Sequence, residues 1–208
     1  MKKILTFTHY ITKTTTMKIV KNIGIALVVI IVLGLIVLYF MPNHYAVSNS
    51  IEINKPADVV YAQVSDFNKW GTWDPWMEMD PEAKVTVEGT PGAPGHKMSW
   101  DGKKSGMGSM TIISAGTNQW VYSGLEFIKP IKATAKDEIK LEANGDKTKV
   151  TWTNTGGLSF PLGRLFGLSV DKALGTDQRK GLDKLKKCTE ALVAAPPVAA
   201  ADSTAKPM

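Results

Sequence analysis

The side chains that could do acid–base chemistry are few. Asp137 lies between Ala135 and Ile139 in an alternating stretch, so strand geometry places its carboxylate on the apolar face. Burial would raise the pKa of such a carboxylate and let it act as a general acid or base. Its residue type and position favour the alternative, a residue near a strand bulge or rim that is satisfied by a backbone or hydroxyl donor.

Two further polar residues are candidates for catalysis by type alone. Asp74 directly precedes Pro75, which is typical of a turn or of the residue that caps a helix N-terminus. His96 begins a predicted strand, and we expect it at the rim of the fold. Because these residues do not combine into a polar network, the sequence assigns no catalytic residue, and Asp137 remains the one candidate.

Motifs for nucleotide, acyl-transfer or metal chemistry are missing from the sequence. It contains no G-x-S-x-G, P-loop, dinucleotide fingerprint or H-E-x-x-H pattern, and residues 102–106 (GKKSG) are typical of a hairpin turn. Cys188 is the only cysteine, and the histidines are His9, His44 and His96. The sequence therefore predicts no disulfide, no metal site and no cofactor.

Large apolar side chains are the more informative set. Trp70, Trp73 and Trp76 fall within seven positions, and indoles packed so densely need a concave partner surface. We expect this stretch to close one end of an internal cavity. Methionines and aromatic residues as a set suit an adaptable pocket for an apolar ligand, although plain core is the favoured interpretation of any single one. The predicted ligand-binding residues are Trp73, Trp76, Met98, Trp100, Met110, Phe127, Trp152 and Leu174.

The elements that would position these residues follow from periodicity. Alternation predicts about seven strands, near residues 45–54, 85–87, 96–100, 106–115, 119–127, 133–143 and 148–155. Two short helices are expected between the first two strands, and a long helix from about Ser169 to Leu192. Gly175 and Gly181 are costly inside that helix, which predicts close approach to the sheet, room for a ligand, or a break near Gly175. The pattern favours an α+β fold in which a bent antiparallel sheet has one wet face.

The N-terminal part predicts a membrane segment. Residues 23–41 form an apolar run of about 28 Å as a helix, close to the thickness of a bilayer core. Residues 1–22 carry five lysines and no acids, which leaves +1 of the net charge of +6 for the rest of the chain. This asymmetry predicts a basic cytoplasmic N-terminus, a single-pass transmembrane helix and a domain outside the inner membrane of a bacterium. A cleaved signal peptide is the alternative.

The balance of charge and composition also limits the rest of the chain. The domain itself has no basic stripe, so we expect no nucleic-acid partner. Residues 194–208 are rich in alanine and proline, which predicts a disordered tail. The folded domain is thus expected over residues 45–193.

Several stretches together resemble a known superfamily. They are residues 53–61 (INKPADVVY), 67–76 (FNKWGTWDPW), 148–152 (TKVTW), 175–177 (GTD) and 181–186 (GLDKLK). In this order they resemble the SRPBCC superfamily of START-like and birch-pollen-allergen-like proteins, in particular its polyketide cyclase/dehydrase-like branch. The resemblance covers about residues 45–193 and implies a helix-grip fold, in which the sheet curls around the long helix and encloses a cavity.

Three functions are compatible with the sequence, because the superfamily spans carriers, receptors and enzymes. The first is a membrane-anchored, non-enzymatic domain that binds a lipid or another hydrophobic small molecule. The second is a polyketide cyclase/dehydrase-like enzyme that uses polar residues of the cavity, such as Asp137. The third is an envelope module that interacts with another protein.

Overall fold

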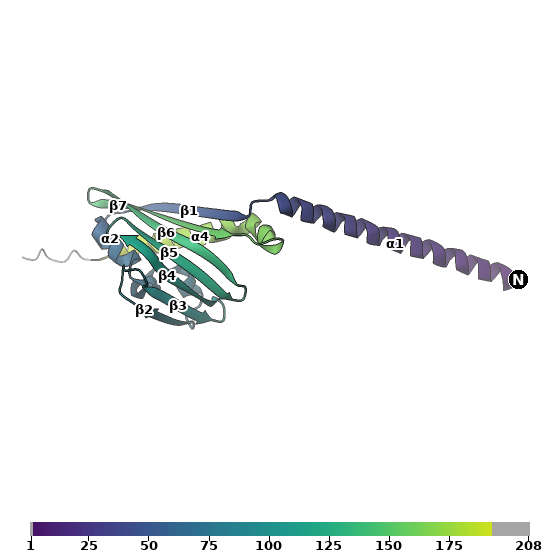
Figure 1. Cartoon of the computed structure of the whole chain (residues 1–208), viewed down its shortest axis with the longest axis horizontal. Coiled ribbons are helices and arrows are strands. Elements are labelled where there is room, and N and C mark those ends of the chain that lie inside the picture. The colour runs from purple at the N-terminus through teal and green to yellow at the C-terminus, as the bar shows by residue number, and fades with distance from the viewer. Residues whose placement is uncertain (1, 193–208) are drawn as a thin grey trace, which may run out of the picture. The chain divides into compact units, whose positions relative to one another are not determined.

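The computed structural model describes residues 2–192, and the predicted tail at 194–208 lies outside them. The described residues divide into two compact units. One comprises residues 2–45 and 157–171, and the other comprises residues 46–156 and 172–192. A long helix lies toward each end of the chain, and the remaining elements form a sheet and its short helices (Figure 1).

The N-terminal helix α1 runs from Lys2 to Phe40 without interruption. Its stretch Met17–Phe40 is the one part of the described residues that is long and apolar enough to cross a membrane. This stretch begins six residues before the apolar run predicted from Ile23, because Lys18 and Lys21 do not interrupt the helix.

Seven strands form one antiparallel sheet, as predicted (Figure 1). They are β1 (His44–Ile53), β2 (Lys84–Glu88), β3 (Lys97–Gly102), β4 (Gly106–Gly116), β5 (Trp120–Lys129), β6 (Ala133–Asn144) and β7 (Lys147–Gly157). Their order in the sheet is β1-β7-β6-β5-β4-β3-β2. Every neighbour from β2 to β7 is reached by a hairpin, whereas β1 and β2 lie at opposite edges. The segment between these two strands must therefore cross the sheet.

That crossing segment is built from short helices. They are α2 (Ala57–Val64), the 3-10 helix η1 (Phe67–Thr72) and α3 (Pro75–Met79). Asp66 caps η1 by accepting a hydrogen bond from the Asn68 backbone N–H, and Asp74 caps α3 in the same way for Trp76. The two predicted short helices correspond to α2 and η1, and α3 is an additional helix that begins at Pro75, a residue favoured in the first helical turn.

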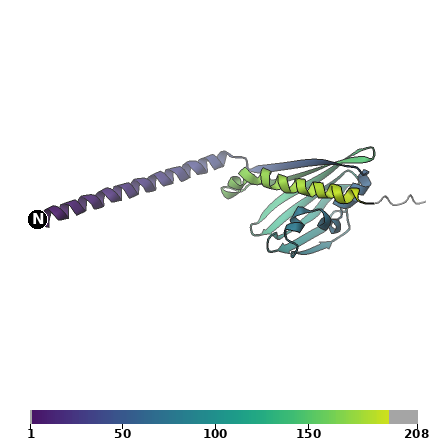
Figure 2. The same cartoon turned by 180° about the vertical axis from the view of Figure 1, so that it is seen from behind.

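Helix α4 spans Leu162–Glu190, so it begins seven residues before the predicted start at Ser169. Residues 172–190 lie on the face of the sheet that also carries the short helices (Figure 2). The predicted break near Gly175 is wrong, because the helix is continuous there. The alternative of close approach holds at Gly181, where a Cβ would lie 3.0 Å from Cδ of Pro75 and 3.1 Å from Cζ3 of Trp152.

The sheet has a buried inner face and a solvated outer face. Along β6 the inward Ala135, Asp137, Ile139 and Leu141 are buried, and the residues between them are exposed. The pairing of β4 with β5 shifts register at Met107/Gly108 and at Ile112/Ser114. Such shifts bend a strand and increase its twist, which lets the sheet wrap around α4. This is the predicted helix-grip architecture.

Candidate functional site in the interior between sheet and helix

A row of polar side chains crosses the otherwise apolar inner face. Ser123 on β5 pairs with Asp137 on β6, and Asp137 pairs with Asn154 on β7. All three side chains are buried. Polar groups cost free energy when they are removed from water, so a buried row of this kind needs internal partners.

Asp137 finds two of these partners. Its Oδ1 accepts a hydrogen bond of 2.7 Å from Nδ2 of Asn154 and one of 3.1 Å from Nε1 of Trp152. Burial raises the pKa of Asp137 to about 6, and the two donors oppose this rise because they stabilise the charged form. The inward orientation predicted for Asp137 is confirmed, but its partners are side chains of β7 rather than a backbone or hydroxyl donor.

Asp74 is a second buried carboxylate. It caps α3 through a 2.9 Å hydrogen bond from the Trp76 backbone N–H, which confirms the predicted capping role. Burial, with a smaller contribution from the nearby charge of Asp137, raises the pKa of Asp74 to about 7 despite this bond. The interior therefore holds two interacting carboxylates, each of which exchanges its proton more readily near neutral pH than an exposed aspartate does.

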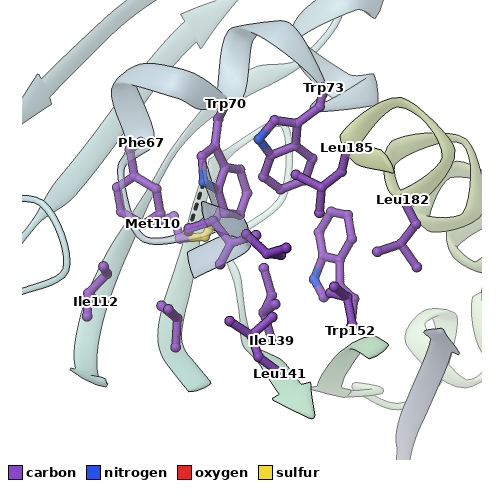
Figure 3. Packing of buried hydrophobic residues seen from close by; sticks show 14 of the residues in the cluster. Phe67, Trp70, Trp73, Met110, Ile112, Ile139, Leu141, Trp152, Leu182 and Leu185 are labelled. Atoms are coloured by element: carbon purple, nitrogen blue, oxygen red, sulfur yellow. Dashed lines mark hydrogen bonds between the residues drawn. The ribbon is translucent and has the colours of Figure 1, made fainter. Parts of the chain in front are cut away.

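Trp152 connects these acids to the aromatic stretch. Its ring makes edge contacts with Trp70, Trp73 and Trp76, at centroid distances of 6.0, 5.6 and 5.7 Å. Figure 3 shows Trp70 of η1 and Trp73, which directly follows η1, pointing toward Trp152, with Leu182 and Leu185 of α4 beside them. Edge-to-face packing of this kind holds aromatic rings in fixed orientations. The stretch is consequently a structural wall of the interior.

Three buried donors have no hydrogen-bond partner among the described residues: Nε1 of Trp73, Nε of Arg164 and Nε2 of Gln178. Nε1 of Trp73 lies on the side of its ring that faces Trp70, and the two ring centroids are 4.5 Å apart (Figure 3). Gln178 is fully buried on α4, and its Oε1 accepts a 3.0 Å hydrogen bond from Nδ2 of Asn49.

The eight residues predicted to bind ligand fall into two groups on the structure. Trp73, Met98, Met110 and Trp152 are buried in the core cluster, whereas Trp76, Trp100, Phe127 and Leu174 are only half-buried. Trp100 and Phe127 pack edge to face at 6.0 Å, with Gly108 between them in the sheet leaving room for the indole. Contact of these eight residues with a ligand stays a prediction.

Burial of the inward residues of β5 decreases toward one end of the strand. The inward residues Val121 and Ser123 are buried, but Leu125 and Phe127 are half-buried. The half-buried Trp100 lies at the same end of the sheet, since it and Phe127 both pair with Gly108. Apolar side chains are thus partly accessible at one end, next to the polar row.

The expectation that His96 lies at the rim is wrong. The side chain is fully buried and stacks on Phe67 with ring centroids 4.8 Å apart. Nε2 accepts a hydrogen bond of 3.0 Å from the Phe67 backbone N–H, and Nδ1 lies 3.0 Å from the carbonyl oxygen of Glu88. These partners require the neutral tautomer with the proton on Nδ1. His96 therefore joins η1 to the sheet and has no place in the polar row.

Sequence reasoning missed Ser123, Asn154 and Gln178. Alternation carried beyond Val150 and Trp152 would have placed Asn154 on the inner face, and the same rule would have placed Ser123 there from Val121. Gln178 lies four residues after Leu174 and four before Leu182, on the apolar stripe of α4. A polar residue at an inward position was the available signal in each case.

Comparison with known proteins agrees with this architecture. The family described as "Polyketide cyclase / dehydrase and lipid transport" matches residues 44–190. A crystal structure from Chromobacterium violaceum is 15% identical, with a TM-score of 0.51, over 72% of this chain and 99% of its own. A structure from Nitrosospira multiformis is 18% identical, with a TM-score of 0.51, over 69% and 94%. A solution structure from Thermobifida fusca is 19% identical, with a TM-score of 0.50, over 69% and 92%.

A search of the functionally curated proteins gives no match. The structural similarities show the fold, and the family match covers most of the chain. The protein is thus an α+β helix-grip domain of the SRPBCC type, preceded by an apolar helix. It belongs to the polyketide cyclase/dehydrase and lipid transport family.

Proposed function

We propose that this chain is a membrane-anchored domain that binds a lipid or another hydrophobic small molecule between the sheet and α4, without converting it. The observation that carries the proposal is the inner face itself. A buried polar row of Ser123, Asp137 and Asn154 is followed, toward the accessible end, by the half-buried Leu125 and Phe127. This order suits a ligand with an apolar body and one polar group.

The polar groups indicate what the ligand's polar end would carry. Nε2 of Gln178 is a buried donor without a partner among the residues described, and a ligand oxygen could accept its hydrogen bond. Asp137 and Asp74 disfavour an anionic group in the same interior, because a further negative charge would repel both carboxylates. We therefore expect a hydroxyl or carbonyl oxygen rather than a carboxylate or phosphate at the buried end.

The apolar body of the ligand would contact the predicted set of residues. The half-buried Trp76, Trp100, Phe127 and Leu174 are the first that an entering molecule would meet. Trp73, Met98, Met110 and Trp152 lie deeper, and we expect them to adjust to the end of the ligand. Methionine suits this role because its side chain is flexible and polarisable.

The location follows from α1. The candidate membrane span Met17–Phe40 is preceded by lysines and is followed by no lysine before Lys55, which supports a cytoplasmic N-terminus. We place the anchor in the inner membrane of a bacterium and the binding domain on its outer side. Loss of α1 by signal cleavage would instead release the domain.

The test is to find the ligand. The full chain is purified in mild detergent, and native mass spectrometry then compares the wild type with Leu125→Arg, which introduces a charge at the half-buried apolar end. A bound apolar molecule on the wild type that is reduced several-fold on the variant supports the proposal. Ile113→Arg, on an exposed position of β4, is the matched control. A wild-type chain that carries no apolar molecule under any extraction condition contradicts it.

The paired carboxylates favour one further function, acid–base catalysis. Both pKa values lie near the pH at which a general acid or base works well. The molecule extracted above would be returned to the protein and followed by chromatography and NMR. A new species that forms with the wild type and not with Asp137→Asn supports an enzyme, whereas an unchanged molecule supports binding alone.

A further inference from the structure

An exposed apolar segment lies within the unit that contains α1. It comprises residues 158–168, where α4 begins, and its only charged residue is Arg164. Five large side chains of this segment are exposed to solvent, and Leu162, Leu168 and Phe166 are 76%, 69% and 61% exposed. The other two are Phe160 and Leu165. A soluble surface rarely groups so many large apolar side chains in so short a segment.

The segment is tied to the end of α1 by its one charge. Nη1 of Arg164 donates to the carbonyl oxygens of Leu38, Tyr39 and Met41, at 3.3, 2.5 and 2.6 Å. The last carbonyls of a helix lack partners within the helix and form its negative end, so a guanidinium satisfies them and is favoured by the dipole. Arg164 thereby directs its charge to the helix end and leaves the surface of the segment apolar.

Two further contacts fix the segment at the same place. The backbone N–H of Leu158 donates to the carbonyl oxygen of Asn43 at 2.8 Å. Phe160 packs edge to face against Tyr39 with centroids 6.3 Å apart. The segment is consequently held within a few residues of Phe40, where the apolar stretch Met17–Phe40 ends.

This position determines the depth of the segment if α1 spans a bilayer. The end of a spanning helix lies at the boundary between acyl chains and head groups, where aromatic side chains and arginine are favoured. Tyr39, Phe40, Phe160 and Phe166 supply aromatic rings at this level. A bilayer would bury the exposed apolar side chains there without any other partner.

We propose that residues 158–168 form a second membrane contact, which lies in the outer interface of the bilayer that α1 crosses. The inference rests on the membrane anchor of the proposed function. The partner of this surface is lipid. The surface is continuous with the apolar surface of α1, and it carries no free charge for a protein partner to recognise. The start of α4 is then held in the bilayer surface as well as by α1.

The experiment uses the full chain in vesicles of phosphatidylcholine and phosphatidylglycerol. Cys188→Ser removes the natural thiol, and one cysteine is placed at Leu162, Val32 or Glu138 and labelled with an environment-sensitive dye. Val32 lies in α1 and reports insertion of the anchor. Glu138 lies on the exposed outer face of β6 and reports a position in water. Nitroxide-labelled lipid is then added as a quencher, and emission is recorded.

We expect the dye at Leu162 to show blue-shifted emission and quenching by nitroxide lipid several-fold stronger than at Glu138. Quenching at Val32 with none at Leu162 overturns this inference and leaves the anchor intact. Blue-shifted emission at Leu162 that nitroxide lipid does not quench shows that protein covers the segment, which also overturns it. If neither Val32 nor Leu162 is quenched, the anchor of the proposed function fails, and this inference fails with it.

Discussion

The raised pKa of the buried Asp74 predicts how the free energy of unfolding changes with pH. Its pKa is raised from 3.8 to about 7 in the folded protein. The folded state therefore holds this proton more tightly than the unfolded state does, and stability declines as pH rises between these two values. Asp74→Asn keeps a side-chain oxygen that can cap α3 but removes the charge. The variant should lose this decline.

The size of this change in the free energy of unfolding follows from the difference between the two pKa values. For each pH unit between them, the contribution of Asp74 to the free energy of unfolding falls by about 1.4 kcal/mol, and the interval from pH 5 to pH 7 covers roughly two pH units. Between pH 5 and pH 8.5 the free energy of unfolding of Asp74→Asn should thus rise by about 3 kcal/mol relative to the wild type. Above pH 7 the variant should be the more stable protein.

The assay is urea unfolding of the full chain in mild detergent, followed by tryptophan fluorescence at pH 5 and pH 8.5. Asp74→Ala is the matched control, because it removes the charge and the cap together. It should be less stable than Asp74→Asn by about 1 kcal/mol at both pH values. A difference between Asp74→Asn and the wild type that does not change with pH would refute the reasoning, as would a variant that is less stable at pH 8.5.

Two other predictions concern the packing of α4 against its neighbours and the hydrogen bond between Trp152 and Asp137. Gly181→Ala should destabilise the protein by about 1–2 kcal/mol in urea unfolding, because the new Cβ meets Pro75 and Trp152 at 3.0 and 3.1 Å. Gly175→Ala has only ordinary contacts and should be neutral or stabilising by up to about 1 kcal/mol, and equal effects at the two sites would contradict the close approach. Trp152→Phe removes an indole donor from Asp137, so the pKa of Asp137, followed by NMR titration, should rise further. An unchanged or lower pKa would show that this hydrogen bond contributes little.

The sheet was predictable because its signal is local. Alternation placed the inward residues of β6 correctly, and the hairpin at Gly145 follows from a turn that favours positive φ. The start of α4 was less predictable. Residues 162–168 are apolar on several sides rather than on one stripe, which hides the helical period, and their position beside α1 cannot be read from spacing.

The candidate site was only half predictable, for a physical reason. The inward position of Asp137 follows from the strand period, but the pKa of a buried acid depends on partners that are distant in sequence. Asp74 lies 63 residues before Asp137, and nothing local indicates that the charge of one raises the pKa of the other. Asp74 was correctly predicted as a cap, but its burial is not apparent from the residues around it in the sequence.

Several departures from the local pattern lie in the interior between the sheet and α4. Asp137 and Asn154 occupy inward positions where apolar residues would stabilise the core more. Gln178 does the same on α4. Proteins commonly accept such costs where a site is needed. This concentration of buried polar groups beside half-buried apolar ones is the reason to place the ligand here.

The central claim is that an apolar ligand occupies the interior between the sheet and α4. The most direct measurement uses a photoactivatable fatty alcohol, which has the apolar body and neutral oxygen inferred above, added to the full chain in detergent and mapped by peptide mass spectrometry. Cross-links should fall on residues 98–100, 125–127 and 174–178, and they should be competed by the unlabelled alcohol. Cross-links confined to residues 17–40 and 158–168 would show a molecule that contacts only membrane-facing surfaces, and would contradict the claim.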